Sequence, residues 1–337
     1  MTATIDTAER TEVRNDRRYV EELDKRVLIY DGAMGTQIHE AGLTAEDYGG
    51  VALEGCNENL VLIRLEVIER IHEDYLAAGA DVIETDTFQG SRLKLDEWGL
   101  GEKTLEINRK AAVIARRVAD RWSTPERPRF VAGSIGPTGM LPSADDPALS
   151  KITYAELSDI FYEQAQGLAE GGVDLFIVET MVDILELRAA INGINRLNRD
   201  LGRQLPIQAQ AFFDVSGRML LGTDIEAVMT TLEALQGVDL IGLNCGTGPE
   251  HMREPIRFLT EHSRTKISVI PNAGLPINVN DKAVFPLGPE AMAQDLAEFV
   301  NEFGVNTVGG CCGTTPAHIA AIVAAIGDRA PKERIIL

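Results

Sequence analysis

Three of the four cysteines follow short apolar runs, in an arrangement that suits a metal ion. Cys245 comes directly after the run 239–244, and Cys311 and Cys312 come shortly after the run 305–309. Thiolates suit Zn²⁺, and three protein ligands leave one coordination position open for water or substrate. The pattern favours a metal site over the alternative, a small core residue at 245 and an unrelated strained pair at 311–312.

Two adjacent cysteines in a regular strand point to opposite faces of the sheet. Cys311 and Cys312 can therefore share a metal only where the backbone is irregular, and the glycines of the segment 309–313 supply that freedom. The fourth cysteine, Cys56, falls in a loop away from the strand ends, so we expect it to be structural. The five histidines show no paired ligand spacing, and we expect them on helices and at the surface.

Glu179 and the segment 31–36 are further candidates for binding chemistry. Glu179 ends an otherwise apolar run, where a carboxylate is costly unless a cation or an ammonium group pairs with it; the alternative is a salt bridge at the rim. In the segment 31–36, DGAMGT, small residues let backbone N–H groups converge on a carboxylate or phosphate, although a tight strand-to-helix turn fits equally well. The similar segment 133–139 is expected to be loop geometry.

Eight apolar, β-branched runs alternate with amphipathic stretches along the chain. The runs predict strands at 27–30, 82–85, 129–133, 174–179, 207–213, 239–244, 267–271 and 305–309. Helical patterns cover 61–78, 104–121, 154–170, 183–197, 225–236, 250–263 and 290–303, and a further helix is expected to begin near Thr315-Pro316. Strict alternation is typical of parallel βαβ units, and eight of them without a linker favour a closed (βα)₈ TIM barrel over an open doubly wound sheet.

A repeated helix-to-strand turn supports this prediction. The segments 77–85, 170–180, 235–244 and 302–310 each contain a helix end, a glycine suited to a left-handed position, Asp or Asn, and then a buried strand. Barrel enzymes work at the carboxyl ends of their strands. The residues that stand there are polar: Asp31, Glu84 to Asp86, Ser134, Glu179, Asp214, Asn244, Asn272 and the cysteines.

The composition excludes several classes of partner. With 32 Lys and Arg against 52 Asp and Glu, the formal net charge of the 337 residues is −20, which disfavours nucleic acid and anionic membranes. We see no signal peptide and no apolar run of about 18 residues, and four cysteines are too few for a disulfide framework, so a cytoplasmic location is expected. We predict a polar N-terminal extension at 1–20, which is either frayed or an added helix, one barrel domain at 21–328, and a tail or truncated interdomain linker at 329–337.

The motifs together resemble the homocysteine S-methyltransferase family over residues 25–328, most closely the homocysteine-binding modules of its cobalamin-dependent branch. The resemblance rests on eight ordered blocks, which are DGAMGTQI at 31–38, EGCNENL at 54–60, AGADVIETDTF at 78–88, GSIGPTG at 133–139, GVDLFIVET at 172–180, GLNCGTGP at 242–249, PNAGLP at 271–276 and GGCCGTTPAHI at 309–319.

The resemblance implies a role for each of the candidate site residues. Cys245, Cys311 and Cys312 would hold Zn²⁺, with the homocysteine sulfur in the open position and Asp31 close to that sulfur. Asn272 would occupy the fourth zinc position when substrate is absent, Asn244 would contribute to the substrate site, and Glu179 would bind the ammonium group. The carboxylate would meet the loop formed by Gly32, Ala33, Met34, Gly35 and Thr36.

The methyl donor is the least defined part of this assignment. Since the sequence ends at Leu337, we expect methylcobalamin carried by another module, in cis or in trans, together with a folate-binding module. Betaine or S-methylmethionine is the alternative donor. Two other classes stay open: a redox or iron–sulfur protein with a CCG element, which needs a fourth cysteine, and a non-catalytic amino-acid-binding barrel.

Overall fold

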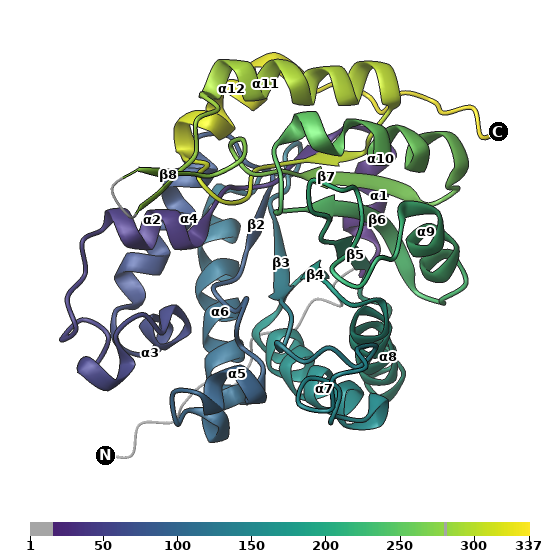
Figure 1. Ribbon diagram of the computed structural model, residues 1–337. Helices are drawn as coiled ribbons and strands as arrows, with labels where there is room; N and C mark the ends of the chain where they lie inside the picture. Colours follow the sequence, from purple (N-terminus) through teal and green to yellow (C-terminus); the bar gives the residue numbers. More distant parts are fainter. Residues whose placement is uncertain (1–15, 280–281) are drawn as a thin grey trace.

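The computed structural model describes residues 16–279 and 282–337, and its centre is a sheet of eight parallel strands curved into a barrel (Figure 1). The strand order is β1-β10-β7-β6-β5-β4-β3-β2, and a bridge between Tyr30 and Val82 joins β1 to β2. The strands are β1 Leu28–Ile29, β2 Val82–Glu84, β3 Phe130–Ile135, β4 Leu175–Met181, β5 Ile207–Ala211, β6 Val238–Asn244, β7 Lys266–Ile270 and β10 Thr307–Val308. Each predicted strand is present, and the (βα)₈ TIM barrel is confirmed.

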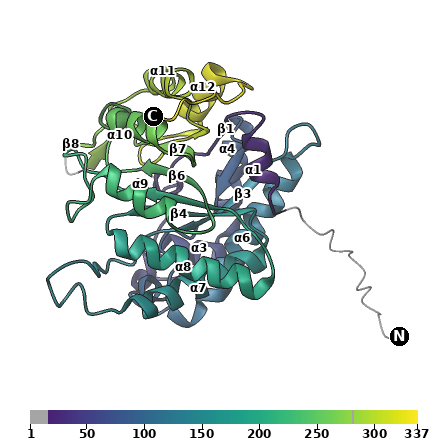
Figure 2. The ribbon, with the colours of Figure 1, turned by 90° about the vertical axis from the view of Figure 1, so that its right-hand side faces the viewer.

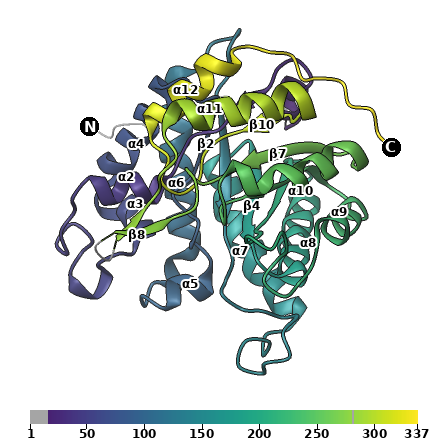
Figure 3. The same ribbon diagram turned by 45° about the horizontal axis from the view of Figure 1, so that its top comes forward.

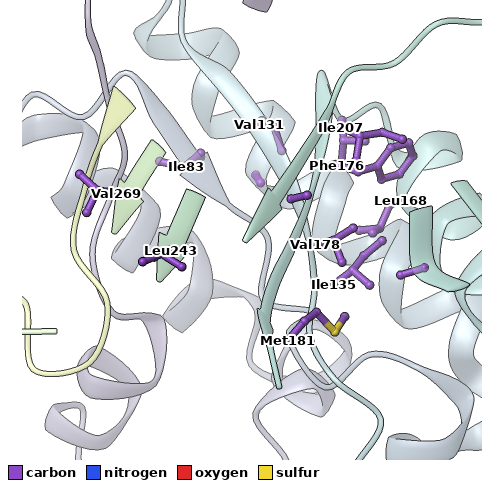
Figure 4. Close-up of a cluster of buried hydrophobic side chains, with 14 of the residues drawn as sticks. Ile83, Val131, Ile135, Leu168, Phe176, Val178, Met181, Ile207, Leu243 and Val269 are labelled. Carbon is purple, nitrogen blue, oxygen red and sulfur yellow. The ribbon is translucent and has the colours of Figure 1, made fainter. Parts of the chain in front are cut away.

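Successive residues of each strand point in opposite directions, one toward the barrel interior and the next toward the surrounding helices. In β4, Leu175 and Ile177 belong to the interior cluster, whereas Phe176 and Val178 belong to the larger cluster between strands and helices. Figure 4 shows part of this outer layer around Val178. The same alternation turns Glu179 inward at the carboxyl end of the barrel.

Helices follow the strands around the outside, and α7 and α8 lie together on one side of the barrel (Figure 2). The main helices are α3 Leu60–Ile63, α4 Leu65–Ala77, α6 Thr104–Trp122, α7 Tyr154–Gly171, α8 Ile184–Leu201, α9 Ile225–Glu233, α10 Pro249–His262, α11 Pro289–Glu298 and α12 Pro316–Ile326. Local sequence explains several starts: Thr153 and Glu156 form a capping box for α7, and α10, α11 and α12 begin with proline. The predicted helix 61–78 is interrupted at Arg64, where the backbone leaves helical geometry.

The repeated helix-to-strand turns have one structure. Their glycines, at 79, 172, 237 and 304, all have positive φ, between 77° and 105°. The Asp or Asn that follows binds the backbone N–H of the neighbouring strand: Asp174 accepts from Val131 over 2.8 Å, and Asn306 accepts from Ile267 over 2.9 Å. Each turn therefore both ends a helix and sets the register of two strands.

The N-terminal boundary differs from the prediction. Helix α1, Arg18–Leu23, begins before residue 21, and its Tyr19 and Leu23 are buried in the barrel interior. The Tyr19 hydroxyl lies 3.1 Å from the Tyr30 hydroxyl and donates to Gln208 over 3.1 Å. Helix α1 is therefore part of the barrel, because one of its faces is buried and hydrogen-bonded there. The polar composition of 1–20 gave no sign of this face. Residues 1–15 of the predicted extension lie outside the described residues.

The C-terminal segment is held against the barrel. The backbone N–H of Val27 donates to the carbonyl of Arg329, and Arg334 donates to the carbonyls of Thr260, Ser263 and Thr265. The carbonyls of Thr260 and Ser263 lie at the end of α10, where a cation is favourable. The segment 329–337 is therefore anchored to the protein at several positions, although most of its residues are exposed.

The long loops have different structures. The loop 140–152 has no helix or strand, whereas the loop 275–289 contains a hairpin of β8 Ile277–Val279 and β9 Lys282–Val284, on the side of the barrel where α2, Met34–Glu40, lies (Figure 3). The hairpin was not predicted because both strands are short and β8 is solvent-exposed. Neither 16–279 nor 282–337 contains a helix that is long and apolar enough to cross a membrane.

Candidate metal centre at the mouth of the barrel

The three predicted thiols come together at the carboxyl end of the barrel. The Sγ atoms of Cys245 and Cys312 are 3.7 Å apart, and those of all three cysteines lie within 4.8 Å of one another. In the described part of the chain, these residues are the one group of three or more His, Cys, Asp or Glu side chains that could share a metal ion. Cys56 is buried elsewhere, so an iron–sulfur cluster would lack its fourth thiolate.

The backbone around the thiols is irregular, as predicted. Cys245 has a φ of 57° and Gly313 a φ of 78°, and a left-handed conformation is uncommon for a residue other than glycine. Hydrogen bonds fix these turns: Cys311 donates its N–H to the carbonyl of Pro271 over 2.8 Å, and Cys245 donates to that of Ile270 over 3.0 Å. These backbone hydrogen bonds help to hold the three sulfurs close together.

The thiols influence one another strongly. Hydrogen bonds with Cys245 and Cys311 lower the pKa of Cys312, whereas hydrogen bonds with Cys245 and Cys312, burial and the charge of these two sulfurs raise the pKa of Cys311. Three thiolates at this separation repel one another unless a cation neutralises them. The donor set and its spacing therefore fit a soft divalent ion such as Zn²⁺.

Asn272 lies beside the thiols and supports their loop. Its Oδ1 accepts a hydrogen bond from the backbone N–H of Cys312 over 3.1 Å, and the N–H of Ala273 donates to the carbonyl of Cys312. An amide oxygen has two lone pairs, so this bond leaves one of them for another partner.

Glu179 faces the interior beside the thiols and is only 6% exposed. Its Oε1 accepts from the hydroxyl of Ser134 over 2.5 Å, and its Oε2 accepts from the side-chain amide of Asn244 over 3.0 Å. Burial raises the pKa of Glu179 to about 7, although the bonds from Ser134 and Asn244 oppose this shift. Of the described Arg and Lys side chains, none forms an ion pair with Glu179, so this part of the structure does not support the alternative of a rim salt bridge.

Asn244 also forms hydrogen bonds with Thr180, near the end of β4. Its amide nitrogen also donates to the Thr180 hydroxyl over 2.8 Å, and its Oδ1 accepts from the Thr180 N–H over 2.6 Å. Thr180 has a φ of 58°. Asn244 thus connects Glu179 with the neighbouring metal-site residue Cys245 and holds the carboxylate in place.

Two further carboxyl groups, Asp31 and Glu84, lie close to Glu179. Burial raises the pKa of both well above their ordinary values, and the charge of Glu179 raises them further. Asp31 accepts the N–H of Glu84 over 3.0 Å, while its carbonyl accepts the N–H of Gly310 in the thiol loop. The sequence marked Glu84 by its place at a strand end but gave no sign that it would share a hydrogen bond with Glu179.

The loop 32–36 is also at this site, but only part of it is free to bind an anion. The N–H of Ala33 donates to the Thr314 hydroxyl over 3.1 Å, and the Thr36 hydroxyl accepts from the N–H of Gly313 over 3.2 Å. Since α2 begins at Met34, the N–H groups of Met34, Gly35 and Thr36 have no carbonyl four residues earlier in the helix. These three N–H groups are the ones that remain for the predicted binding of an anion.

Asp214 does not belong to the site. It is exposed, and it binds Ser216 and the N–H of Gly217 within its own turn. The predicted strand 207–213 is shorter in the structure, because β5 ends at Ala211 and Asp214 stands in the turn that follows. The five histidines all lie in helices and none joins the thiols, although His72 and His318 are buried rather than at the surface.

The comparisons with known proteins agree with this geometry. A family model described as homocysteine S-methyltransferase matches residues 28–326. The chain belongs to the homocysteine S-methyltransferase family. Members of this family are methyltransferases, and the predicted family resemblance is confirmed.

Curated relatives and solved structures extend the comparison. This chain is 44% identical to the methionine synthase of Mycobacterium tuberculosis over 319 residues, which are 95% of this chain and 26% of that protein. It is also 44% identical to the methionine synthase of Mycobacterium leprae, over 92% of this chain and 25% of that protein. The chain therefore spans about a quarter of the length of these relatives.

The fold is shared with the homocysteine methyltransferase MmuM of Escherichia coli. An oxidised form of MmuM matches with a TM-score of 0.70 and 24% identity over 92% of this chain and 99% of that one. A metallated form matches with a TM-score of 0.69 and 23% identity over the same shares of the two chains.

Proposed function

We propose that this chain is a zinc-dependent homocysteine S-methyltransferase that activates the homocysteine thiol for attack on a methyl group and yields methionine. The observation that carries the proposal is the cluster of Cys245, Cys311 and Cys312, with sulfurs within 4.8 Å of one another beside a buried carboxylate. Zn²⁺ bound there would lower the pKa of the substrate thiol and hold the sulfur as a thiolate.

The chain's own residues would hold the amino-acid end of homocysteine. A free alkyl thiol has a pKa near 8.5 and is mostly protonated at neutral pH, so the substrate must be placed where its proton can leave. Glu179 would accept the ammonium group, because it is a buried carboxylate without an ion-pair partner in the part of the chain that the structure describes. The N–H groups of Met34, Gly35 and Thr36 would bind the carboxylate at the start of α2.

Asp31 and Asn272 would complete the site around the sulfur. Asp31 is only 3% exposed and its backbone carbonyl accepts the N–H of Gly310 in the thiol loop, which supports the proposal that its carboxyl group would lie close to the substrate sulfur. Asn272 would offer its second lone pair to the metal until the substrate displaces it.

We infer that the methyl group comes from methylcobalamin carried by another module or protein. The methionine synthases that this chain resembles are about four times as long, so further modules for cobalamin and folate are the expected partners, in cis or in trans. The net charge of −20 disfavours nucleic acid and membranes as partners, and a cytoplasmic location fits this chemistry.

Methionine formation tests the proposal. Zinc-loaded protein is incubated with homocysteine and, separately, methylcobalamin, betaine or S-methylmethionine. We expect methionine with methylcobalamin and none with the other two donors, and none from metal-stripped protein with any donor. Methionine from betaine or S-methylmethionine alone would overturn the donor assignment, and no methionine with any donor would overturn the proposed function.

A further inference from the structure

The side chain of Thr314 joins the loop that carries two thiols to the loop that begins α2. Its hydroxyl accepts a hydrogen bond from the N–H of Ala33 over 3.1 Å and donates one to the carbonyl of Cys311 over 2.7 Å. A hydroxyl has one proton and two lone pairs, so both bonds form at the same time. Thr314 is fully buried, so both hydrogen bonds are shielded from solvent.

Tyr75 of α4 supports the same connection from the outer side. Its hydroxyl lies 3.1 Å from the carbonyl of Ala33 and 3.3 Å from that of Thr314, so its one proton is shared between the two loops. Gly32 is packed against both side chains: a Cβ at this position would lie 2.7 Å from the Thr314 hydroxyl and 2.9 Å from the Tyr75 hydroxyl. A larger residue at 32 would have to displace the connection.

This connection has a consequence for any ligand that uses both loops. A thiol amino acid would place its sulfur at the cysteines and its carboxylate at the N–H groups of residues 34–36. Its chain must then match the separation between the loops, and Thr314 is bonded to the backbone of both. For a homocysteine that spans the two loops fully extended, a ligand that is one methylene shorter reaches both ends only if the loops move closer together.

We propose that Thr314, supported by Tyr75, is a positioning residue that fixes the length of the thiol amino acid and so distinguishes homocysteine from cysteine. The inference rests on the proposed function, because it assumes that homocysteine binds at both loops. Where a site fits one length, a missing methylene changes affinity by about 10- to 200-fold.

The ratio of two affinities tests the proposal. Calorimetry on zinc-loaded protein gives the Kd of homocysteine and of cysteine, and we expect homocysteine to bind at least about tenfold more tightly. Thr314→Val removes the hydroxyl at nearly constant volume. It should lower the ratio to about threefold or less, mainly by weakening homocysteine, while the zinc content stays unchanged. Thr314→Ser, which keeps the hydroxyl, should restore the original ratio.

Thr307→Val is the matched control. Thr307 is also fully buried, and its hydroxyl donates to the carbonyl of Leu28 over 2.8 Å within the β1–β10 pair, away from both loops. This variant should keep the original ratio. If Thr314→Val does not fold, Tyr75→Phe provides a second test, since it removes the hydroxyl that bonds both loops and should also lower the ratio.

Several results would overturn the inference. These are an unchanged ratio in Thr314→Val or Tyr75→Phe, an equal loss of affinity for both ligands, or a loss of zinc that shows Thr314 to support the metal site alone. If the natural sequence binds neither thiol amino acid, the proposed function itself is wrong and the inference falls with it.

Discussion

Cys311→Ala should no longer hold zinc after dialysis against a competing chelator, and it should form no methionine. The three thiols are the one described group of His, Cys, Asp or Glu side chains that could share an ion, so no other side chain of this kind is placed to replace the lost sulfur. Zinc sites with four ligands bind with about 10–16 kcal/mol, so the loss of one thiolate should weaken binding by roughly a hundredfold to a thousandfold. Metal analysis of the dialysed protein measures this directly.

Cys56→Ala provides the control for this experiment. Cys56 is buried, its pKa is raised to about 12 by burial, and it lies outside the thiol cluster. The variant should keep one zinc per chain, with at most a loss of stability from the missing sulfur. Full zinc retention in Cys311→Ala, or loss of zinc in Cys56→Ala, would contradict the assignment of the ligands.

Glu179→Gln should weaken homocysteine binding by about 1.5–3 kcal/mol, which is roughly a tenfold to hundredfold rise in Kd. The substitution keeps the size of the side chain but removes the charge that would meet the substrate ammonium group. Zinc content should not change, because Glu179 is not one of the ligands. Calorimetric titration of the zinc-loaded variant with homocysteine measures the effect.

Glu186→Gln is a matched control for the change at 179. Glu186 is fully buried on α8, burial raises its pKa to about 7, and it accepts hydrogen bonds from the backbone and hydroxyl of Thr138. Its bonds do not involve the thiols or Glu179. If Glu179→Gln binds homocysteine as tightly as the natural sequence does, the role of Glu179 is purely structural.

The barrel and the thiol site could be predicted because both depend on short-range patterns. Apolar runs define the strands, and parallel strands bring their carboxyl ends to one edge. Cys245 follows β6 and Cys311 follows the strand near 305–309, and these two strands flank β7 in the sheet. Residues that are distant in the sequence therefore meet wherever the strand order is that of a closed barrel.

The contacts around the proposed substrate site could not be predicted in the same way. The hydrogen bonds of Thr314 and Tyr75 depend on how α4 packs against two loops, and no short-range sequence pattern predicts that packing. The same holds for the Ser134 hydroxyl on Glu179 and for the shared hydrogen bond of Glu84. The packing of helix α1 into the barrel was not predicted because its buried Tyr19 and Leu23 stand among charged residues.

The central claim is that the homocysteine thiol becomes a thiolate when it binds, and counting protons tests it most directly. Calorimetry in buffers of different ionisation enthalpy gives the protons released by homocysteine and by methionine, which has the same amino-acid end but no thiol proton. Subtraction removes any proton released by Glu179 or its neighbours. We predict a difference close to one proton for zinc-loaded protein near neutral pH, and none for zinc-free protein. A difference near zero for the zinc-loaded protein would show that the thiol is not activated at this site.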